Sequence, residues 1–483
     1  MACTENETAN AAEITKVTDI QKIIAEKIIK MPSDNNPIVA HRFGADPAVL
    51  IYKDTVYIYS TNDHQQLEYS KGNDNNTYGK INSLNLCSSK DLVNWTDLGV
   101  IPVAGRNGGN GPAKWANNSW APAVAWKNID GKDKFFLYFA DNGSGIGVLT
   151  ADSPEGPFID PLGKQLISRQ TPNCANVNWL FDPAVFIDDD GKGYIYFGGG
   201  HDQDKFEHPM TGRCAALGDD MISIVGEPQT IDAPYLFEDS GINKINNLYY
   251  YTYCTNWVGR TETATVPPVG VIGYMTSEKP LGPFEYKGYT LKNPSSYFGA
   301  GAGGNNHHWI FEFKGKHYIA FHAPTPEKML KLPKTGYRSL YIADFKVNED
   351  GSLPYQTATS AGVEPVCNFD IFAEVPVATF HSVKKIAVTS KRTLEAVEDG
   401  GYVCIKGADF ADGAKKVVLD VVSDGTKGSL KIVADNLNGI VLADVKIGKK
   451  AQIEEKLASV SGVHDVYFVF TGNFELTGWK FLK

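Results

Sequence analysis

The sequence predicts an all-β protein in which a five-bladed β-propeller is followed by a small β-sandwich of jelly-roll type. Two observations predict this architecture. Over most of the 483 residues one pattern recurs five times: an apolar segment, a turn of Gly, Asn or Asp, and a strand rich in Tyr and Phe. After about residue 372 the aromatic residues become sparse, and apolar and polar positions alternate between closely spaced turn residues. Strand-only repeats of this length are typical of radial arrays of blades, and the later alternation is typical of a sandwich.

Each of the five copies has the pattern of a β-hairpin. Repetition of a whole unit favours a propeller over the alternative, a set of ordinary meanders in a sandwich. The third copy contains the run IDDDGKG at the position of its turn, so we interpret this run as a hairpin turn and not as a calcium loop. The copies are ADPAVLIYKDTVYIYSTND (45–63), WAPAVAWKNIDGKDKFFLYFADNG (120–143), FDPAVFIDDDGKGYIYFGGG (181–200), APYLFEDSGINKINNLYYYTYC (233–254) and NNHHWIFEFKGKHYIAFHAPT (305–325).

The repeats, and the change in residue pattern after about residue 372, divide the chain into three segments. Residues 1–34 form an N-terminal extension, whose apolar positions between 13 and 31 have helical spacing and predict a short helix packed against the propeller. Residues 35–372 form the propeller, and residues 373–483 form the sandwich.

The first residues of the five copies are the candidates for a functional site. In a propeller the innermost strand of each blade lines the central channel, so the five starting points converge at one end of the axis. We therefore expect Asp46, Trp120, Asp182 and Glu238, with His307 or His308, to meet in one pocket. An Asp before Pro can also be a purely local turn residue. The copies that begin at Trp120 and Ala233 lack this Asp, so the fold does not require it, which favours a functional reading.

Three carboxyl groups in one pocket suit the hydrolysis of a glycosidic bond. One acid protonates the leaving oxygen, and a carboxylate activates water or attacks the sugar. A third carboxylate can raise the pKa of the acid, because nearby like charges disfavour ionisation. Trp115 and Trp120 would offer a sugar ring a stacking surface.

Composition disfavours several other classes of function. The formal net charge of −10 and the lack of a basic stripe disfavour nucleic acid, because phosphate binding needs clustered Lys and Arg. No stretch approaches the roughly 18 apolar residues of a membrane span. The seven cysteines are single, without a C-x-x-C motif, which predicts free thiols in a reducing compartment. We expect a monomer.

The first residues bear on localisation. MACTENETANAAE has no apolar segment of the kind found in signal peptides, so a cytoplasmic location is expected if Met1 is the native start. The alternative is a mature lipoprotein that begins at Cys3, secreted or lipid-anchored.

Long contiguous segments resemble glycoside hydrolase family 43. They include FGADPAVLIYKDTVYIY, NNSWAPAVAWKNIDGKDKFFLYFADNGSGIGVLTADSPEGPF, WLFDPAVFIDDDGKGYIYFGGG, DAPYLFEDSGI and GGNNHHWIF, and they span roughly residues 36–370. Within the family the chain is most similar to arabinoxylan arabinofuranohydrolases. The resemblance implies an inverting enzyme with a five-bladed propeller.

The resemblance also implies roles for individual residues. Asp46 would be the general base, Asp182 the residue that tunes the pKa and orients groups, and Glu238 the general acid. His307 or His308 would face a central cation, usually calcium, held largely through water. The substrate contacts would come from Arg338, Trp120 and Asn306 of the NNHH segment.

The expected function is removal of α-L-arabinofuranosyl side chains from arabinoxylan or its oligosaccharides. A β-D-xylosidase, or an enzyme with both activities, is the close alternative, and a non-catalytic sugar-binding propeller is the more distant one. The tail resembles a family 6 carbohydrate-binding module in KGADFADGAKKVVLDV and GVHDVYFVFTG. Its start, VATFHSVKKIAV, lacks the paired glutamates that bind calcium in that module, so a purely structural sandwich is an equal expectation.

Overall fold

The computed structural model describes residues 16–263, 265–333, 335–425, 427–449 and 451–483. The chain is mostly β, as the sequence predicts, and divides into two compact units. Lys30–Cys367 form the first, called here the five-sheet unit. Asn368–Lys483, with the described part of Met1–Ile29, form the second, called the two-sheet unit.

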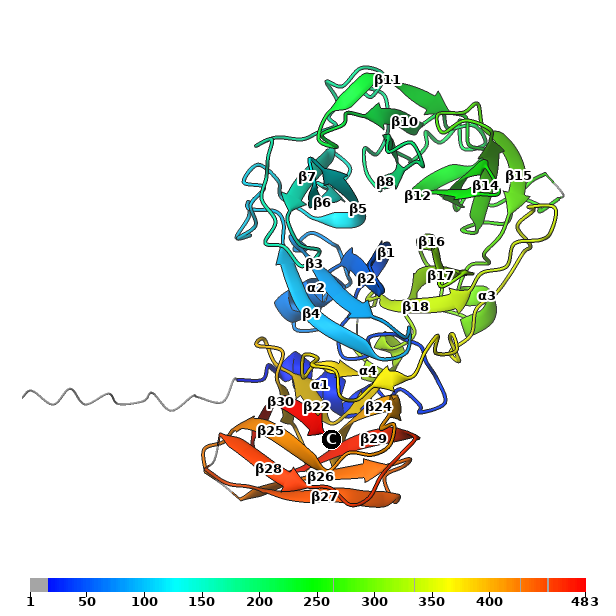
Figure 1. The fold of residues 1–483 in the computed structure, drawn as a ribbon. Helices are drawn as coiled ribbons and strands as arrows, with labels where there is room; N and C mark the ends of the chain where they lie inside the picture. Colours follow the sequence, from blue (N-terminus) through cyan, green and yellow to red (C-terminus); the bar gives the residue numbers. More distant parts are fainter. Residues whose placement is uncertain (1–15, 264, 334, 426, 450) are drawn as a thin grey trace, which may run out of the picture. The chain divides into compact units, whose positions relative to one another are not determined.

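The five-sheet unit contains five antiparallel sheets that follow one another along the chain, and each predicted hairpin supplies the first two strands of one sheet (Figure 1). The sheets are β1 (Ala45–Tyr52), β2 (Thr55–Thr61), β3 (Ser83–Ser89) and β4 (Trp95–Pro102); β5 (Trp120–Ile129), β6 (Lys132–Ala140) and β7 (Ile146–Ala151); β8 (Ala184–Ile187), β9 (Gly193–Phe197), β10 (Gly212–Leu217) and β11 (Ile224–Ile231); β12 (Leu236–Ile245), β13 (Leu248–Thr255), β14 (Ile272–Ser277) and β15 (Glu285–Tyr289); and β16 (His308–Phe313), β17 (Lys316–Ala323) and β18 (Ser339–Asp344). The helices of this unit are α2 (Asp63–Ser70), α3 (Ser295–Phe298) and α4 (Glu327–Leu330).

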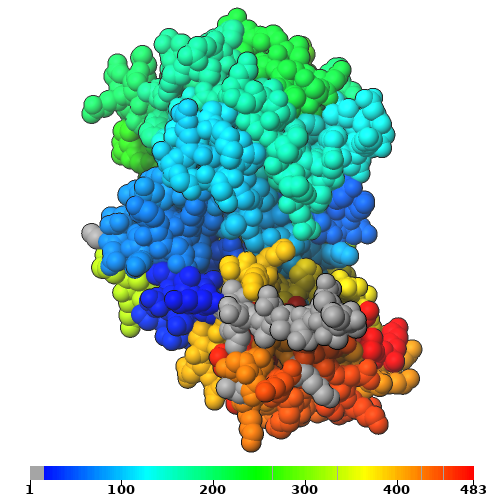
Figure 2. All heavy atoms as spheres, turned by 90° about the vertical axis from the view of Figure 1, so that its left-hand side faces the viewer, coloured from blue at the N-terminus to red at the C-terminus, as the bar shows by residue number. Residues whose placement is uncertain are grey.

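The first strands of the five sheets surround a common centre (Figure 1). β1 contacts β5, β5 contacts β8, β8 contacts β12, β12 contacts β16, and β16 returns to contact β1. Separate apolar clusters join neighbouring sheets, for example Leu86 with Leu137 and Tyr196 with Tyr251. The alternating aromatic residues of the repeats therefore fill the spaces between sheets. Figure 2 shows, in light blue and cyan, the closely packed outer surface of the first two sheets.

The ends of the first strands depart from regular pairing. The β1–β2 register shifts between Ala45 and Ala48, and Asp46 lies there with φ 52°. Asp182, just before β8, has φ 46°, and Asp239 has φ 68° within the register shift of β12 between Glu238 and Gly241. Positive φ is uncommon for residues other than glycine, and bulges of this kind redirect side chains. The Asp-Pro-Ala-Val repeat thus begins with a left-handed residue whose side chain leaves the sheet.

The two-sheet unit encloses one apolar core between two sheets. Ile405 and Phe468 enter this core from one sheet, and Leu419 and Phe481 enter it from the other. One sheet has the order β19-β24-β29-β26-β27, with β21 beside β24, and the other has the order β22-β23-β30-β25-β28. The strands of these sheets are β19 (Phe369–Asp370), β21 (Ser382–Lys384), β22 (Ile386–Val388), β23 (Leu394–Ala396), β24 (Gly401–Asp409), β25 (Lys416–Val422), β26 (Gly428–Ala434), β27 (Ile440–Ile447), β28 (Gln452–Lys456), β29 (Val463–Thr471) and β30 (Glu475–Leu482). The two-residue strand β20 (Thr379–Phe380) also lies in this segment of the chain.

The N-terminal helix α1 (Asp19–Lys27) exists as predicted, but the expectation that it packs against the five repeats is wrong. It belongs to the two-sheet unit and contacts β22, an edge strand. Ile20 and Ile24 are buried, and the Ala25 carbonyl accepts a hydrogen bond of 2.8 Å from the Lys385 N–H. Helical spacing predicts an apolar face but does not say which apolar surface covers it.

Two further predictions concern the described residues. No helix among them is long and apolar enough to cross a membrane. The six described cysteines are free thiols, as expected. Cys3 and the hypotheses about the first residues lie outside the described part of the chain.

Candidate active site

The starting points of the five repeats line one cavity of about 310 Å³. Six residues that the sequence singles out contribute to it: Asp46, Trp120, Asp182, Glu238, His307 and Arg338. The remaining lining residues are Thr61, Thr77, Tyr78, Ala121, Trp179, Phe181, Phe237 and Asn305. Aromatic walls around a few convergent polar groups are typical of a ligand site.

Asp46 is buried and surrounded by cationic and hydrogen-bonding groups. Its Oδ1 accepts a 2.8 Å hydrogen bond from Nη1 of Arg338, and its backbone N–H donates to Nδ1 of His322 at 3.0 Å. Burial opposes ionisation of Asp46, but Arg338, His307 and His322 together outweigh it and hold the pKa of Asp46 well below its usual range. Asp46 is therefore an ionised carboxylate facing the cavity.

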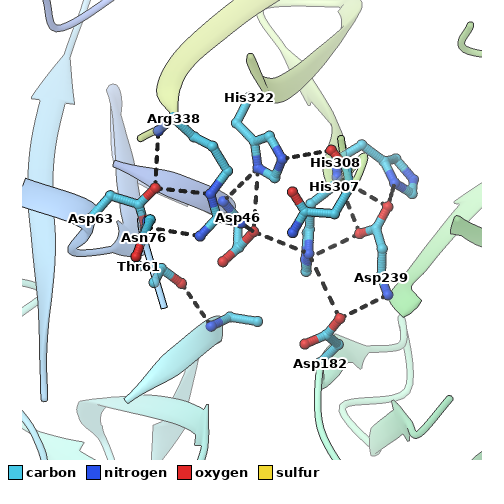
Figure 3. Close-up of polar contacts among 12 residues, drawn as sticks. Asp46, Thr61, Asp63, Asn76, Asp182, Asp239, His307, His308, His322 and Arg338 are labelled. Atoms are coloured by element: carbon cyan, nitrogen blue, oxygen red, sulfur yellow. Dashed lines mark hydrogen bonds and ion pairs between the residues drawn. The ribbon is translucent and has the colours of Figure 1, made fainter. Parts of the chain in front are cut away.

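Arg338 is itself fixed by Asp63, a residue that sequence reasoning missed. Asp63 is fully buried at the start of α2, and its two carboxylate oxygens accept from Nε and Nη2 of Arg338 at 2.9 and 2.8 Å. The Arg338 backbone N–H donates to the same carboxylate at 3.0 Å, and the guanidinium lies over the Tyr78 ring at 4.9 Å. This bidentate pairing leaves Nη1 directed at Asp46 (Figure 3).

Asp182 lies across the cavity from Arg338 and accepts a 3.0 Å hydrogen bond from the Asp239 backbone N–H (Figure 3). Burial, together with the nearby charge of Asp46, raises the pKa of Asp182 well above its usual range. The hydrogen bond from Asp239 acts in the opposite direction, because it stabilises the ionised form.

Glu238 is a second carboxyl group of the cavity with a raised pKa. Burial raises its pKa well above the usual range, and the charges of Asp182 and Asp46 raise it further. Its Oε1 is buried and has no hydrogen-bond partner among the described residues. Since Asp182 accepts an N–H that favours its charged form and Glu238 Oε1 does not, we assign the shared proton of this pair to Glu238.

Two histidines, His307 and His308, lie beside the buried carboxyl group of Asp239. The His308 ring lies with Nδ1 2.5 Å from Asp239 Oδ2 and Nε2 2.8 Å from Thr252 Oγ1, and its backbone N–H donates to the same carboxylate. Burial lowers the pKa of His308 to about 3, so the ring is neutral. His307 lies between the acids, with Nε2 3.1 Å from Asp239 and Nδ1 3.5 Å from Asp46 and 3.8 Å from Asp182.

The described residues do not fit a directly coordinated calcium ion. Calcium takes six to eight oxygen ligands, and in the described ranges no group of three or more His, Cys, Asp or Glu side chains is disposed to hold a metal. Both ring nitrogens of His308 already have partners, so this histidine is removed from the candidate ligands. His307 lines the cavity and is the one of the pair that can face a bound ion or its water.

Three predicted residues lie outside the cavity lining. Trp115 stacks on Phe139, and its indole N–H donates to Asp160 at 2.9 Å, so it is a packing residue. Asn306 is fully buried and donates to the Gly270 carbonyl at 3.2 Å, and its neighbour Asn305 lines the cavity instead. The third is His308, whose ring contacts Asp239 and Thr252.

Sequence reasoning missed Asp63, Asp239 and His322. Only weak signals mark them: Asp63 closes the first repeat, Asp239 follows Glu238 directly, and His322 interrupts the aromatic second strand of the fifth repeat. The His322 ring accepts the Asp46 N–H at Nδ1 and lies 3.1 Å from the Asn305 carbonyl through Nε2. Each of the three contacts a cavity residue that is distant in the sequence. No local sequence pattern predicts such a contact.

The arrangement places a protonated carboxylic acid and an ionised carboxylate in one cavity with aromatic walls. Residues 35–353 match the family model described as "Glycosyl hydrolases family 43". The chain belongs to glycosyl hydrolase family 43. Residues 378–483 match the model "Carbohydrate binding module (family 6)".

Similar family 43 proteins cover nearly the whole chain. An "Arabinoxylan arabinofuranohydrolase" from Bacillus subtilis (strain 168) is 42% identical and the match covers 94% of each chain. A protein of the same name from Paenibacillus polymyxa is 41% identical over 94% of this chain and 75% of its own. The crystal structure of a family 43 arabinoxylan arabinofuranohydrolase from Bacillus subtilis in complex with cellotetraose has a TM-score of 0.90 and 42% identity, covering 95% of this chain and all of that one.

Proposed function

We propose that this family 43 enzyme hydrolyses the bond between terminal α-L-arabinofuranosyl side chains and the xylan chain, with inversion of configuration. The observation that carries the proposal is the opposite perturbation of two carboxyl groups in one cavity: Asp46 is held ionised and Glu238 is held protonated. An inverting glycosidase needs this pair of states. The names of the two relatives at 41 and 42% identity support arabinoxylan as the substrate.

In this mechanism Glu238 donates its proton to the leaving glycosidic oxygen. Asp46 accepts a proton from a water molecule as that water attacks the anomeric carbon from the opposite face. The charged form of Asp182, which the Asp239 N–H favours, keeps the proton on Glu238, and Arg338 keeps Asp46 charged. We expect the carboxyl groups of Asp46 and Glu238 to lie about 6.5 to 9.5 Å apart, which leaves room for that water.

We also propose that the five sheets are the blades of a five-bladed β-propeller and that the two-sheet unit is a jelly-roll sandwich. The closed series of contacts among β1, β5, β8, β12 and β16 supports the first proposal. The single core between two sheets and the match to the carbohydrate-binding module support the second.

Product analysis tests the activity. Wheat arabinoxylan incubated with the enzyme should release free arabinose and leave the xylan chain length unchanged, and proton NMR should show that the arabinose is first formed with inverted configuration. Aryl α-L-arabinofuranoside should be hydrolysed faster than aryl β-D-xyloside. Preferential release of xylose would favour the β-xylosidase alternative, and retention of configuration would contradict the roles of Asp46 and Glu238.

Calcium remains a proposal for the centre of the unit, held through water beside His307. Such an ion would add positive charge near the acids, and we assign it no step. A ligand that binds only the native state raises its stability. We therefore expect a chelator to lower the melting temperature and calcium, in preference to sodium, to restore it. A melting temperature indifferent to both would reject the site.

A further inference from the structure

The connection between β17 and β18, residues 324–338, ends at Arg338 and contains a buried carboxyl group that the mechanism above does not use. Ala323 and Ser339 pair directly at the ends of the two strands, so the connection leaves the sheet and returns to the same place. Its first turn is the short helix α4, which begins at Glu327. Glu327 is buried but lies outside the cavity lining. Burying a carboxyl group costs stability unless its oxygen atoms are hydrogen-bonded, so its partners indicate what it does.

One oxygen atom of Glu327 accepts hydrogen bonds from two neighbouring backbone groups. The N–H groups of Gly336 and Tyr337 both donate to Oε2 of Glu327 at 2.8 Å. The next N–H along the chain, that of Arg338, donates to Asp63 at 3.0 Å. Two buried carboxyl groups from different helices therefore fix three consecutive N–H groups at the point where the guanidinium side chain begins.

The same segment also supports a second residue of the cavity wall. The Thr335 carbonyl accepts a 3.0 Å hydrogen bond from the Asn76 N–H, and the Gly336 carbonyl accepts one of 3.1 Å from the Asn76 side chain. Oδ1 of Asn76 in turn accepts the backbone N–H of Tyr78 at 3.1 Å. The Tyr78 ring lines the cavity and lies 4.9 Å from the guanidinium of Arg338. A shift of this segment would therefore move Tyr78 and Arg338 together.

We propose that Glu327 is a positioning residue for the reaction, which fixes the guanidinium of Arg338 against Asp46 through the backbone of residues 336–337. The inference rests on the proposed function, because that function makes Asp46 the base. The 2.8 Å contact between Nη1 of Arg338 and Oδ1 of Asp46 requires the guanidinium to lie between Asp46 and Asp63 (Figure 3). Without the Glu327 oxygen atom two N–H groups would lose their partner, and the segment would move to pair them again.

Two variants separate the hydrogen bonds of Glu327 from its charge. Glu327→Met keeps the size of the side chain but has no oxygen acceptor. We expect its kcat/KM to fall about 10- to 100-fold on arabinoxylan and on aryl α-L-arabinofuranoside alike, because a displaced base affects every leaving group. Glu327→Gln keeps one oxygen atom that can accept from both N–H groups, so its kcat/KM should stay within about 3-fold of the wild type.

Asp91→Leu is the matched control. Asp91 is also buried, and its Oδ1 accepts from the neighbouring N–H groups of Val93 and Asn94 at 2.8 and 2.7 Å. These residues lie in the turn between β3 and β4, outside the cavity lining. Asp91→Leu should lower the melting temperature as Glu327→Met does, but leave kcat/KM unchanged. Equal kinetic losses in these two variants would overturn the positioning role, as would wild-type activity in Glu327→Met or an equal loss in Glu327→Gln.

A shorter side chain provides the test if Glu327→Met does not fold. Glu327→Asp keeps the carboxyl group but withdraws it from the N–H groups of Gly336 and Tyr337 by one methylene group. We expect a loss of about 10-fold in kcat/KM on both substrates. Wild-type activity in this variant would contradict the proposal.

A crystal structure of the folded variant separates failure of this inference from failure of the proposed function. We expect Nη1 of Arg338 to lose its 2.8 Å contact with Asp46, while the sheets keep their positions. If the wild type hydrolysed no arabinoside, the proposed function would fail, whereas this displacement would still support the positioning of Arg338 by Glu327. An unchanged contact between Arg338 and Asp46 in the variant would overturn the inference even in an active arabinofuranosidase.

Discussion

Each unit of this protein contains two neighbouring carboxyl groups of which at least one has a raised pKa, and only one of these pairs lies in a candidate active site. In the five-sheet unit the pair is Asp182 and Glu238. In the two-sheet unit Glu395 and Glu475 are directly opposite each other on β23 and β30. Burial, followed by the charge of Glu475, raises the pKa of Glu395 to about 7. A carboxyl group with a raised pKa therefore occurs in both units.

The difference between the pairs is their surroundings. Glu238 lines a cavity that also contains Asp46, whose pKa is shifted in the opposite direction by Arg338. Glu475 instead accepts a 2.9 Å hydrogen bond from the hydroxyl of Thr393, the residue before β23. A perturbed acid thus indicates catalysis only when an oppositely perturbed group shares an accessible cavity with it.

The largest expected effect separates Asp46 from Glu238. Asp46→Asn should lose about 10²- to 10⁴-fold in kcat or more on every substrate, because the base acts whatever the leaving group. Glu238→Gln should lose a similar factor on arabinoxylan but less on an aryl arabinoside with an acidic phenol, which needs little protonation to leave. Steady-state kinetics on both substrates measure this. Equal loss for Glu238→Gln on the two substrates would contradict the acid role, and an active Asp46→Asn enzyme would contradict the mechanism.

The pH profile tests the coupling within the cavity pair. Glu238 acts only when protonated, so activity falls as pH rises through its pKa, and the charge of Asp182 is one cause of that raised pKa. Asp182→Asn removes this charge, so the alkaline limb of kcat/KM should move to lower pH. Asp46, whose pKa is held low, should place the acid limb below the usual range of an aspartate. An alkaline limb that stays in place would show that Asp182 does not act on Glu238.

The smallest effect is expected in the two-sheet unit and concerns stability. Because the pKa of Glu395 is raised in the folded state, the folded protein binds more protons than the unfolded chain between the ordinary glutamate pKa and about 7. The free energy of unfolding therefore decreases as pH rises through this window. Glu395→Gln removes the repulsion, so at pH 8 its melting temperature should exceed that of the wild type by about 2 °C, with a smaller gain at pH 5.

Glu398→Gln is the control for this stability effect. Glu398 is exposed, and its ion pair with Lys385 contributes little in water, so its melting temperature should stay within about 1 °C of the wild type at both pH values. Neither substitution should change activity on the aryl arabinoside. A destabilised Glu395→Gln protein at pH 8 would show that the Glu395–Glu475 pair is not repulsive there.

The sequence by itself predicted the parts of the molecule that depend on local pattern. Alternating aromatic residues and turn residues predicted the five hairpins, because side chains on a strand alternate between its two faces. The hypothesis that the starting points of the hairpins converge followed from the repeat, and Asp46, Asp182 and Glu238 do line one cavity. The position near residue 372 where aromatic residues become sparse likewise lies close to the boundary between the units at Cys367.

Only the tertiary structure decided which groups surround those acids. Asp63 reaches Arg338 across 275 positions of the chain, and His322 reaches Asp46 across 276. It also decided that Trp179 lines the cavity while Trp115 packs against Phe139, and that α1 covers β22. The physical reason is the same in each case. Local sequence sets which face of an element is apolar or polar, but the charge state of a carboxyl group and the exposure of an indole depend on atoms supplied by distant segments.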